Sequence, residues 1–268
     1  MKVNRVCDVF SLGLIDYQKA WDLQKELVGK RAKKEINDTL LLVEHPHIFT
    51  IGRSGSRNNI LVSDKRLKEK SVSVCEVDRG GDITYHGPGQ IVGYPLLDLN
   101  EHGRDVHLML RNLEEVIIRF LSDYGVEACR IPEYTGVWVG QEKIAAIGIG
   151  VRRWITFHGF CLNVNPEMNY FSLINPCGIK GKGVTSLEKL KVNECSGAPV
   201  LQCGLDKSSP YSKRGEMDRI GLERRLVRHF GAVFNLEMRW ARRGDPGRPI
   251  TLGYKQCRLS EKTSSLPG

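Results

Sequence analysis

The sequence predicts an α/β protein whose mixed β-sheet is packed against helices. Three observations support this fold class. Helical and strand-like periodicities alternate over residues 1–195, three strand-like runs follow one another within residues 136–164, and an amphipathic helix occupies residues 218–230. The chain has 268 residues, of which 41% are hydrophobic and 26% charged. This size and composition suffice for a substantial core in a soluble globular protein.

The first half of the chain contains the clearest alternation of elements. Residues 17–33 place apolar side chains at helical spacing among Lys and Glu. Residues 106–124 predict a second helix, with one apolar stripe that starts at Leu108 and with Gly125 as its stop. Strands are expected at 9–14, 39–43, 72–77 and 91–97.

The second half begins with β structure. Strands are expected at 136–140, 143–151 and 154–164, and the tight turns between them predict a meander. Thr185 begins a short predicted helix with Glu188 in its first turn. A strand at 233–238 follows the amphipathic helix and ends the predicted fold.

A single domain is expected over residues 1–238. Residues 193–214 are rich in Gly, Ser and Pro and predict an extra loop, whereas residues 239–268 predict a disordered basic tail. Residues 196–268 hold 14 Lys and Arg against 7 Asp and Glu, which is +7 of the total net charge of +9. Basic surface suits acidic partners, and a solvated tail explains the charge equally well.

The composition also indicates where in the cell the protein is expected and which partners are not expected. No apolar run approaches the roughly 18 residues that span a bilayer. Residues 1–12 lack the apolar core of a secretory signal and the Ser-rich, acid-poor character of a transit peptide. We therefore expect a cytoplasmic protein with no membrane partner. Nucleic acid is not expected either, because no platform of interleaved aromatic and basic residues accompanies the sequence pI of 9.2.

Eight cysteines are present, and none forms a CxxC pair or has a histidine at zinc-finger spacing. No metal site is therefore expected. In a reducing compartment the cysteines should be thiols, most of them small buried apolar residues. The eight are Cys7, Cys75, Cys129, Cys161, Cys177, Cys195, Cys203 and Cys257.

The segment at residues 79–90 has the most unusual composition, with four glycines and a proline in twelve residues between two expected strands. Glycines let the backbone approach a ligand closely, although they also suit an elaborate β-turn. A turn does not require Arg79, Tyr85, His86 and Gln90 together, which favours a binding loop. The segment is neither a GxGxxG nor a Walker loop, so nucleotide binding is not indicated.

Two further residues have alternative interpretations that the sequence leaves open. Lys143 opens an apolar strand, where it is either a solvated edge charge or a cation that points into an apolar cleft. His158 is either a polar site group or a strand histidine with satisfied hydrogen bonds. Cys161 follows in an apolar alternation that favours the core.

Cys177 lies in a Pro-Cys-Gly turn, which exposes a side chain as a core position would not. A thiol in a turn close to a cation becomes nucleophilic, because attack requires the thiolate. A half-buried loop cysteine is the alternative interpretation of the same turn.

Taken together, these segments resemble the lipoyl(octanoyl) transferase family. The whole of residues 79–95 is similar to the family signature, and 135–140, 143–148, His158-Gly159, Leu162-Asn163 and 175–178 recur in the same order. Glu44-His45-Pro46 with residues 50–53 is similar to the family's early segment. The resemblance covers about residues 8–190 and, less tightly, 216–238. The 193–214 loop and the tail after 238 depart from it.

The resemblance implies the fold of the biotin/lipoate protein ligases, a mixed sheet with helices packed on one side. It implies that Cys177 is the acyl-accepting nucleophile and that Lys143 is its partner. The acyl pocket that it implies comprises Arg79, Gly80, Gly81, Asp82, Ile83, Thr84, Tyr85, His86, Ala146, Ile147, Gly148, Gly159, Phe160 and Cys161.

The activity that the resemblance implies is transfer of an octanoyl group from octanoyl-acyl carrier protein, through a Cys177 thioester, to a lysine of a lipoyl domain, the first step of lipoate biosynthesis. The acceptors would be the lipoyl domains of 2-oxoacid dehydrogenase complexes and the glycine cleavage H protein, and no cofactor is expected. Two enzymes of the same fold are the alternatives: an ATP-dependent lipoate-protein ligase and an amidotransferase between lipoyl domains. A non-catalytic acyl-binding protein is the alternative from another class.

Overall fold

The computed structural model describes residues 5–175, 182–190 and 218–241. Its main sheet is mixed: β1 pairs in parallel with β12 and β2, and the strands from β2 through β6, β10, β9 and β8 to β7 pair antiparallel. The order across the sheet is β12 (Leu236–Trp240), β1 (Arg5–Leu14), β2 (Asp38–Glu44), β6 (Gln90–Leu96), β10 (Ile155–Asn163), β9 (Glu142–Arg152), β8 (Tyr134–Val139) and β7 (Cys129–Ile131), with β11 (Gly183–Val184) paired to β9.

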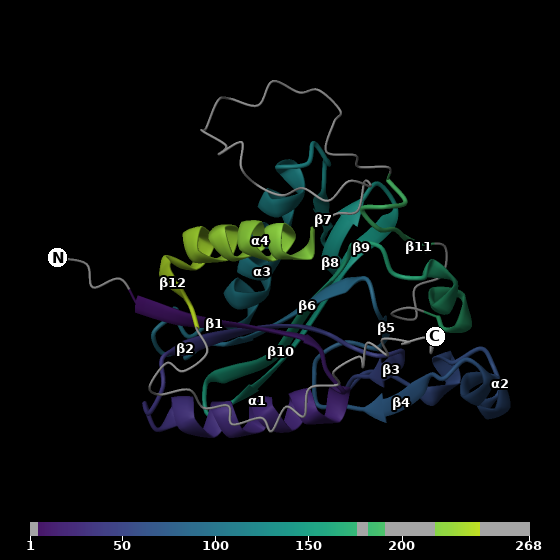
Figure 1. Ribbon diagram of the computed structural model, residues 1–268, viewed down its shortest axis with the longest axis horizontal. Coiled ribbons are helices and arrows are strands. Elements are labelled where there is room, and N and C mark those ends of the chain that lie inside the picture. Colours follow the sequence, from purple (N-terminus) through teal and green to yellow (C-terminus); the bar gives the residue numbers. More distant parts are fainter. Residues whose placement is uncertain (1–4, 176–181, 191–217, 242–268) are drawn as a thin grey trace, which may run out of the picture.

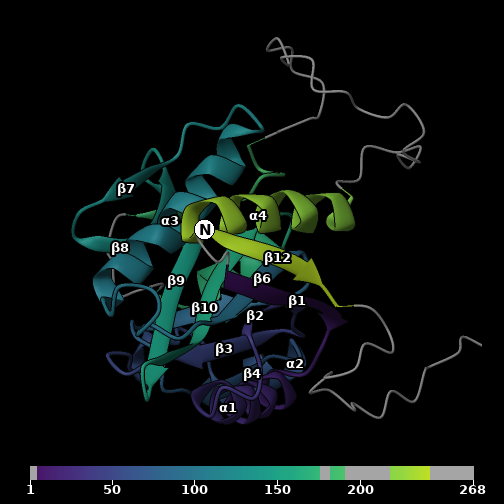
Figure 2. The same ribbon diagram turned by 90° about the vertical axis from the view of Figure 1, so that its left-hand side faces the viewer.

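Helices cover both faces of this sheet, as Figures 1 and 2 show. Helices α3 (Val106–Ser122) and α4 (Arg219–Phe234) pack on one face, in a core that includes Leu40 and Leu42 of β2. Helix α1 (Tyr17–Ala32) packs on the other face against Leu41 and Val43. Alternate residues of β2 thus contact opposite cores. The α/β mixed-sheet prediction is confirmed, but the expectation that the helices lie on one side is wrong.

The three long helices begin where the sequence provides a side-chain cap. The N-cap residues Asp16, Asp105 and Asp218 each accept hydrogen bonds from backbone N–H groups of the first turn. Such caps satisfy donors that the helix itself leaves unpaired. Among the described helices none is both long and apolar enough to cross a membrane.

A second, smaller sheet lies beside the main one and positions the candidate site. Its order is β4 (Ser73–Glu76), β3 (Ile48–Ile51) and β5 (Ile83–His86), flanked by α2 (Asp64–Glu69) and by the 3₁₀ turns η1 (Arg57–Asn59) and η2 (Met168–Leu173). The segment at 79–90, expected as a loop between two strands, therefore contains a buried strand of its own. Pairing of β5 with β3 supplies its backbone hydrogen bonds.

Two local predictions need correction. Thr185 begins no helix, and residues 187–190 form turns, because the N–H groups of Thr185 and Leu187 donate to the carbonyls of Lys143 in β9 and Asn163 in β10. Leu108 is 45% exposed and Met109 takes its place in the core, so the buried stripe of α3 starts one residue later. The meander at 136–164 is confirmed as β8, β9 and β10. The extra loop at 193–214 and nearly all of the tail at 239–268 lie outside the described residues, and β12 extends to Trp240.

Candidate functional site

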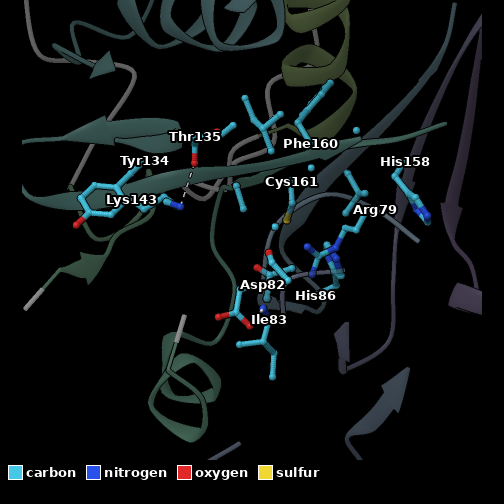
Figure 3. Close-up of a pocket in the computed structure, with 18 of the residues that line it drawn as sticks. Arg79, Asp82, Ile83, His86, Tyr134, Thr135, Lys143, His158, Phe160 and Cys161 are labelled. Carbon is cyan, nitrogen blue, oxygen red and sulfur yellow. Dashed lines mark hydrogen bonds between the residues drawn. The ribbon is translucent and has the colours of Figure 1, made fainter. Parts of the chain in front are cut away.

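A pocket of about 230 Å³ lies between β9 and β10 of the main sheet and the segment that leads into β5 (Figure 3). Its side chains come from elements that are far apart in the sequence, including the first residue of α1 and the turn before β8. The lining residues are Tyr17, Ser54, Arg79, Gly81, Asp82, Ile83, Thr84, His86, Val92, Tyr94, Glu133, Tyr134, Thr135, Lys143, Ala146, Ile147, Gly148, His158, Gly159, Phe160 and Cys161.

The structure brings together most of the residues expected in an acyl pocket. All of them line it except Gly80 and Tyr85. Gly80 lies behind the wall, where its N–H donates to the carbonyl of Ile149 at 2.9 Å. Tyr85 faces the small sheet's core and its hydroxyl bonds to Nδ1 of His47 at 2.8 Å. These two residues support the wall from outside the pocket.

Lys143 is buried at the start of β9, with 8% of its surface exposed. Its Nζ donates to the carbonyl of Thr135 at 3.1 Å (Figure 3) and lies 4.8 Å from the centre of the Trp138 ring. Of the two interpretations of this lysine, a solvated edge charge and a cation in a cleft, the structure supports the second. Thr135 and Glu133 are exposed, so the mouth of the pocket lies at this end.

The segment at 79–82 is fixed as one wall of the pocket. Nη2 of Arg79 donates to the carbonyl of Thr50 at 2.6 Å, and both carboxylate oxygens of Asp82 accept from Nδ2 of Asn59. A Cβ added to Gly148 would lie 2.6 Å from the carbonyl oxygen of Gly80. Backbone therefore packs directly on backbone here, and only glycine at position 148 permits it.

Cys161 lines the middle of the pocket and is 4% exposed. Burial raises the pKa of its thiol, so the thiol form is favoured. A protonated, apolar sulfur suits the wall of a slot for an alkyl chain better than it suits a nucleophile. The described cysteines Cys7, Cys75, Cys129 and Cys161 are all free of disulfides.

The buried end of the pocket is formed by hydroxyls and imidazoles: Tyr17, His86, Tyr94 and His158, here called the polar end. Nε2 of His158 bonds to Asp78 at 2.9 Å, which leaves Nδ1 to accept from the Tyr17 hydroxyl at 3.4 Å. In Figure 3, Lys143 and His158 lie at opposite sides with Cys161 between them.

The hydroxyl of Tyr94, like that of Tyr17, is hydrogen-bonded to a histidine. Behind it, Nδ1 of His45 donates to the carbonyl of Ile15 at 2.7 Å, so Nε2 accepts from the Tyr94 hydroxyl at 2.7 Å. The hydroxyl of Tyr94 is therefore a donor to an imidazole. His86 bonds to Thr50 through Nε2 at 3.4 Å, and its Nδ1 has no hydrogen-bond partner in the part of the chain that the structure describes.

The buried imidazoles make the stability of the fold depend on pH. Burial lowers the pKa of His45 and of His158 to about 4, although Asp78 raises that of His158 and Arg79 and Lys25 lower it further. In the unfolded chain both would titrate near pH 6.5. Their contribution is therefore complete above about pH 6.5 and is lost as the pH falls toward 4.

We expect the free energy of unfolding to fall between pH 7.5 and pH 5 by about 2 kcal/mol for each of these two histidines. Denaturant titration at the two pH values measures it. In His158→Asn the decrease in the free energy of unfolding should be smaller by about the 2 kcal/mol that His158 contributes. Asparagine is the chosen replacement because it tolerates the φ of +54° at this position. The exposed His107→Asn is the control and should leave the fall unchanged. An equal fall in both variants would contradict this assignment.

The sequence places His86 in the expected pocket and leaves His158 as a candidate polar site group, but it does not single out Tyr17, Tyr94 or the supporting His45 as site residues. Tyr17, His45 and Tyr94 lie on α1, after β2 and on β6, and no local spacing connects them. Tyr17 is the first residue of the expected helix at 17–33, where nothing in the local pattern marks it as a site residue. The available signal was the number of histidines and tyrosines in segments that also resembled one family, beginning with Glu44-His45-Pro46.

Cys177 lies outside the described residues, so no distance joins it to Lys143. The described residues on either side of 176–181 are anchored close to the pocket. The N–H of Asn175 donates to the carbonyl of Asn59, whose side chain holds the pocket residue Asp82. On the other side, Val184 pairs with Lys143 in β11 and β9.

Two solved structures share this fold at low sequence identity. A lipoate-protein ligase A bound with ATP superposes with a TM-score of 0.62 and 12% identity, covering 89% of each chain. A bipartite lipoate protein ligase from Thermoplasma acidophilum superposes with a TM-score of 0.60 and 13% identity, covering 89% of this chain and 86% of that chain. The molecule is thus a protein of the lipoate-ligase fold class.

Sequence comparison is more specific. Residues 16–202 match the lipoyl protein ligase A/B catalytic domain family. An octanoyltransferase of Solibacter usitatus is 45% identical, and the match covers 87% of this chain and 96% of that protein. An octanoyltransferase of Christiangramia forsetii is 41% identical, and the match covers 89% of this chain and 100% of that protein. An octanoyltransferase of Caldicellulosiruptor bescii is 56% identical, and the match covers 68% of this chain and 81% of that protein. The chain belongs to the octanoyltransferases of the lipoyl protein ligase A/B family, as the sequence motifs predicted.

Proposed function

We propose that this chain moves an octanoyl group from octanoyl-acyl carrier protein, through a thioester on Cys177, to the ε-amine of a lysine on a lipoyl domain. One observation carries the proposal: a buried lysine, Lys143, stands at the mouth of a pocket whose middle is apolar, in a chain of the octanoyltransferase family. The acceptors are the lipoyl domains of 2-oxoacid dehydrogenase complexes and the glycine cleavage H protein.

The first half-reaction is a thioester exchange. The Cys177 thiolate attacks the acyl carbonyl, the bond to the carrier's sulfur breaks, and the carrier leaves as a thiol. Lys143 supports this step either as an ammonium that stabilises the thiolate or as a neutral amine that takes the thiol proton. One thioester replaces another, so the step requires no activation by ATP.

The second half-reaction forms an amide. The acceptor lysine attacks the acyl-enzyme as a neutral amine, the carbon–sulfur bond breaks, and the amine loses a proton. A neutral Lys143 can take up that proton, since its Nζ is held at the mouth of the pocket by the Thr135 carbonyl. An amide is more stable than a thioester, so this step runs downhill without a cofactor.

The middle of the pocket provides the slot for the acyl chain. Ala146, Gly148, Gly159 and Cys161 present little side-chain volume and no strong hydrogen-bonding group, and β9 pairs Ala146 with Cys161 and Gly148 with Gly159. Each methylene buried in such a slot contributes about 0.8 kcal/mol. The slot thus holds the chain while the carbonyl end stays close to Lys143.

The experiment is intact-mass measurement of the purified protein after incubation with octanoyl-acyl carrier protein and no ATP. We expect a mass gain of one octanoyl group that hydroxylamine removes, followed by transfer to a purified lipoyl domain. An ATP-dependent ligase would show no covalent gain, and it would octanoylate a lipoyl domain only when octanoate and ATP were supplied together. A non-catalytic binding protein would show none under either condition, and both results would contradict the proposal.

A further inference from the structure

A buried carboxylate on α3 lies behind the lysine of the pocket. Glu114 interrupts the apolar stripe of α3 and is 1% exposed, so its charge requires partners inside the protein. Its Oε2 accepts from Nη1 of Arg111 at 2.7 Å and from Nε of Arg130 at 3.1 Å. These ion pairs attach α3 to β7, but they account for only one of the two carboxylate oxygens.

The other oxygen, Oε1, accepts from the backbone N–H of Gly136 at 3.1 Å. The same peptide group carries the carbonyl of Thr135, which accepts from Nζ of Lys143 at 3.1 Å (Figure 3). None of the described peptide bonds is cis, and in a planar trans peptide the N–H and the C=O point in opposite directions. One peptide group therefore joins the carboxylate on one side to the lysine of the pocket on the other.

The stem of Lys143 also packs on this peptide group. Gly136 has a φ of +128°, and a Cβ added there would lie 3.3 Å from Cε of Lys143 and 2.6 Å from the carbonyl oxygen of Ala145. A side chain at position 136 would therefore displace the lysine or the backbone of β9. The placement of the 135–136 peptide thus determines where the amine of Lys143 lies in the mouth of the pocket.

Resting on the proposed function, we propose that Glu114 is a positioning residue for Lys143. A carboxylate that accepts from the N–H of a peptide increases the negative charge on the carbonyl oxygen of that peptide, because linked hydrogen bonds polarise one another. The carbonyl of Thr135 is thereby a stronger acceptor for the lysine. Glu114 does not line the pocket, and it acts from the α3 side of the sheet without contacting the acyl group.

The test is Glu114→Gln, which keeps the shape of the side chain and removes its charge. A glutamine amide has one acceptor oxygen, so it turns a non-accepting NH₂ group either to Gly136 or to the arginines. We expect single-turnover loading or transfer to a lipoyl domain, whichever depends on Lys143, to fall about tenfold to a hundredfold, as when a supporting partner of a functional group is lost. The loss should lie in kcat, with KM unchanged.

A double-mutant cycle with Lys143→Met separates positioning from general support of the fold. If Glu114 acts through Lys143, Glu114→Gln should slow the wild-type enzyme and leave the residual rate of Lys143→Met unchanged. A merely structural role would lower the rate by the same factor in both backgrounds, and that result would overturn the inference.

Glu115→Gln is the matched control. Glu115 is the next residue of α3, and its Oε2 also accepts from Arg130, at 2.6 Å, but the N–H of Gly136 donates to Glu114. Glu115→Gln therefore makes the same chemical change at the same arginine without removing the bond to the peptide. It should keep the wild-type rates of loading and transfer.

Glu114→Asp is the second variant if melting temperatures show that Glu114→Gln does not fold. It keeps the charge beside the arginines and withdraws it from Gly136 by one carbon–carbon bond, about 1.5 Å, so it should show the same loss. Wild-type rates in the folded variants would overturn the positioning role alone. Absence of octanoyl loading by the wild type would overturn the proposed function, and this inference with it.

Discussion

Replacement of Cys177 by serine is expected to lower acyl-enzyme formation from octanoyl-acyl carrier protein by about a thousandfold or more, as loss of a nucleophile does in other covalent enzymes. A serine hydroxyl titrates far above neutral pH, so far less of it is present as the anion than of a cysteine thiol, and the attack is correspondingly slower. Rapid-quench intact-mass measurement gives the rate of loading for wild type and variant.

The surroundings of the described cysteines do not favour any of them as the nucleophile. Cys161 lines the pocket, but burial raises its pKa, and burial raises the pKa of Cys7 as well. Cys129 is exposed on β7 and is not part of the pocket. No described cysteine therefore combines access to the pocket with an environment that favours the thiolate. The sequence predicts a Pro-Cys-Gly turn around Cys177, and the family resemblance implies that Cys177 is the nucleophile.

Cys129→Ser is the matched control, because it makes the same chemical change at an exposed position outside the pocket. It should load octanoyl at the wild-type rate. If Cys177→Ser still gained an octanoyl group that hydroxylamine removed, another thiol would be the acceptor, and the mechanism proposed for Cys177 would have to be abandoned.

The sequence predicted those parts of the fold that are determined locally. The helices at α1, α3 and α4 have apolar periodicity and an aspartate cap, and β8 to β10 are joined by short turns. Strand β5 was missed because its four residues lie in a glycine-rich segment. Its pairing with β3, more than thirty residues away, makes it a strand. Such pairing is a tertiary effect that overrides local propensity.

In the candidate site, too, residues in local motifs could be predicted, whereas residues brought together only by the fold could not. Loop 79–86, Lys143 and the glycines of β9 and β10 were predicted because they lie in compact motifs. Of the polar end, His86 and His158 lie in predicted motifs. Tyr17 and Tyr94 are not singled out by the sequence, since they come from α1 and β6 and meet the histidines only in the folded chain. His158 adds a left-handed backbone at φ +54°, which no pattern in the sequence indicates.

Replacement of Lys143 by methionine is expected to lower octanoyl transfer to a lipoyl domain by about 10²–10⁴-fold, the range typical for loss of a general acid–base group. Methionine keeps the length of the buried side chain and removes only the group that can hold or move a proton. Steady-state transfer and single-turnover loading, measured separately, show which half-reaction depends on it.

Lys189→Met provides the comparison, because Lys189 is a half-exposed lysine of the same region whose Nζ bonds to Glu142, the residue before Lys143, at 2.6 Å. It lies outside the pocket and should retain wild-type transfer. A loss of less than tenfold in folded Lys143→Met would show that the buried lysine is a structural group.

Lys143→Arg separates the two roles that the site permits. Arginine stays charged at any pH that the fold tolerates, so it can stabilise a thiolate but cannot accept a proton. If Lys143 acts as a cation, Lys143→Arg should recover much of the loading rate that Lys143→Met loses. If Lys143 accepts protons, both variants should be equally slow in transfer to the lipoyl domain. The contact between Nζ and the Thr135 carbonyl is compatible with either protonation state, since an ammonium and a neutral amine both donate hydrogen bonds.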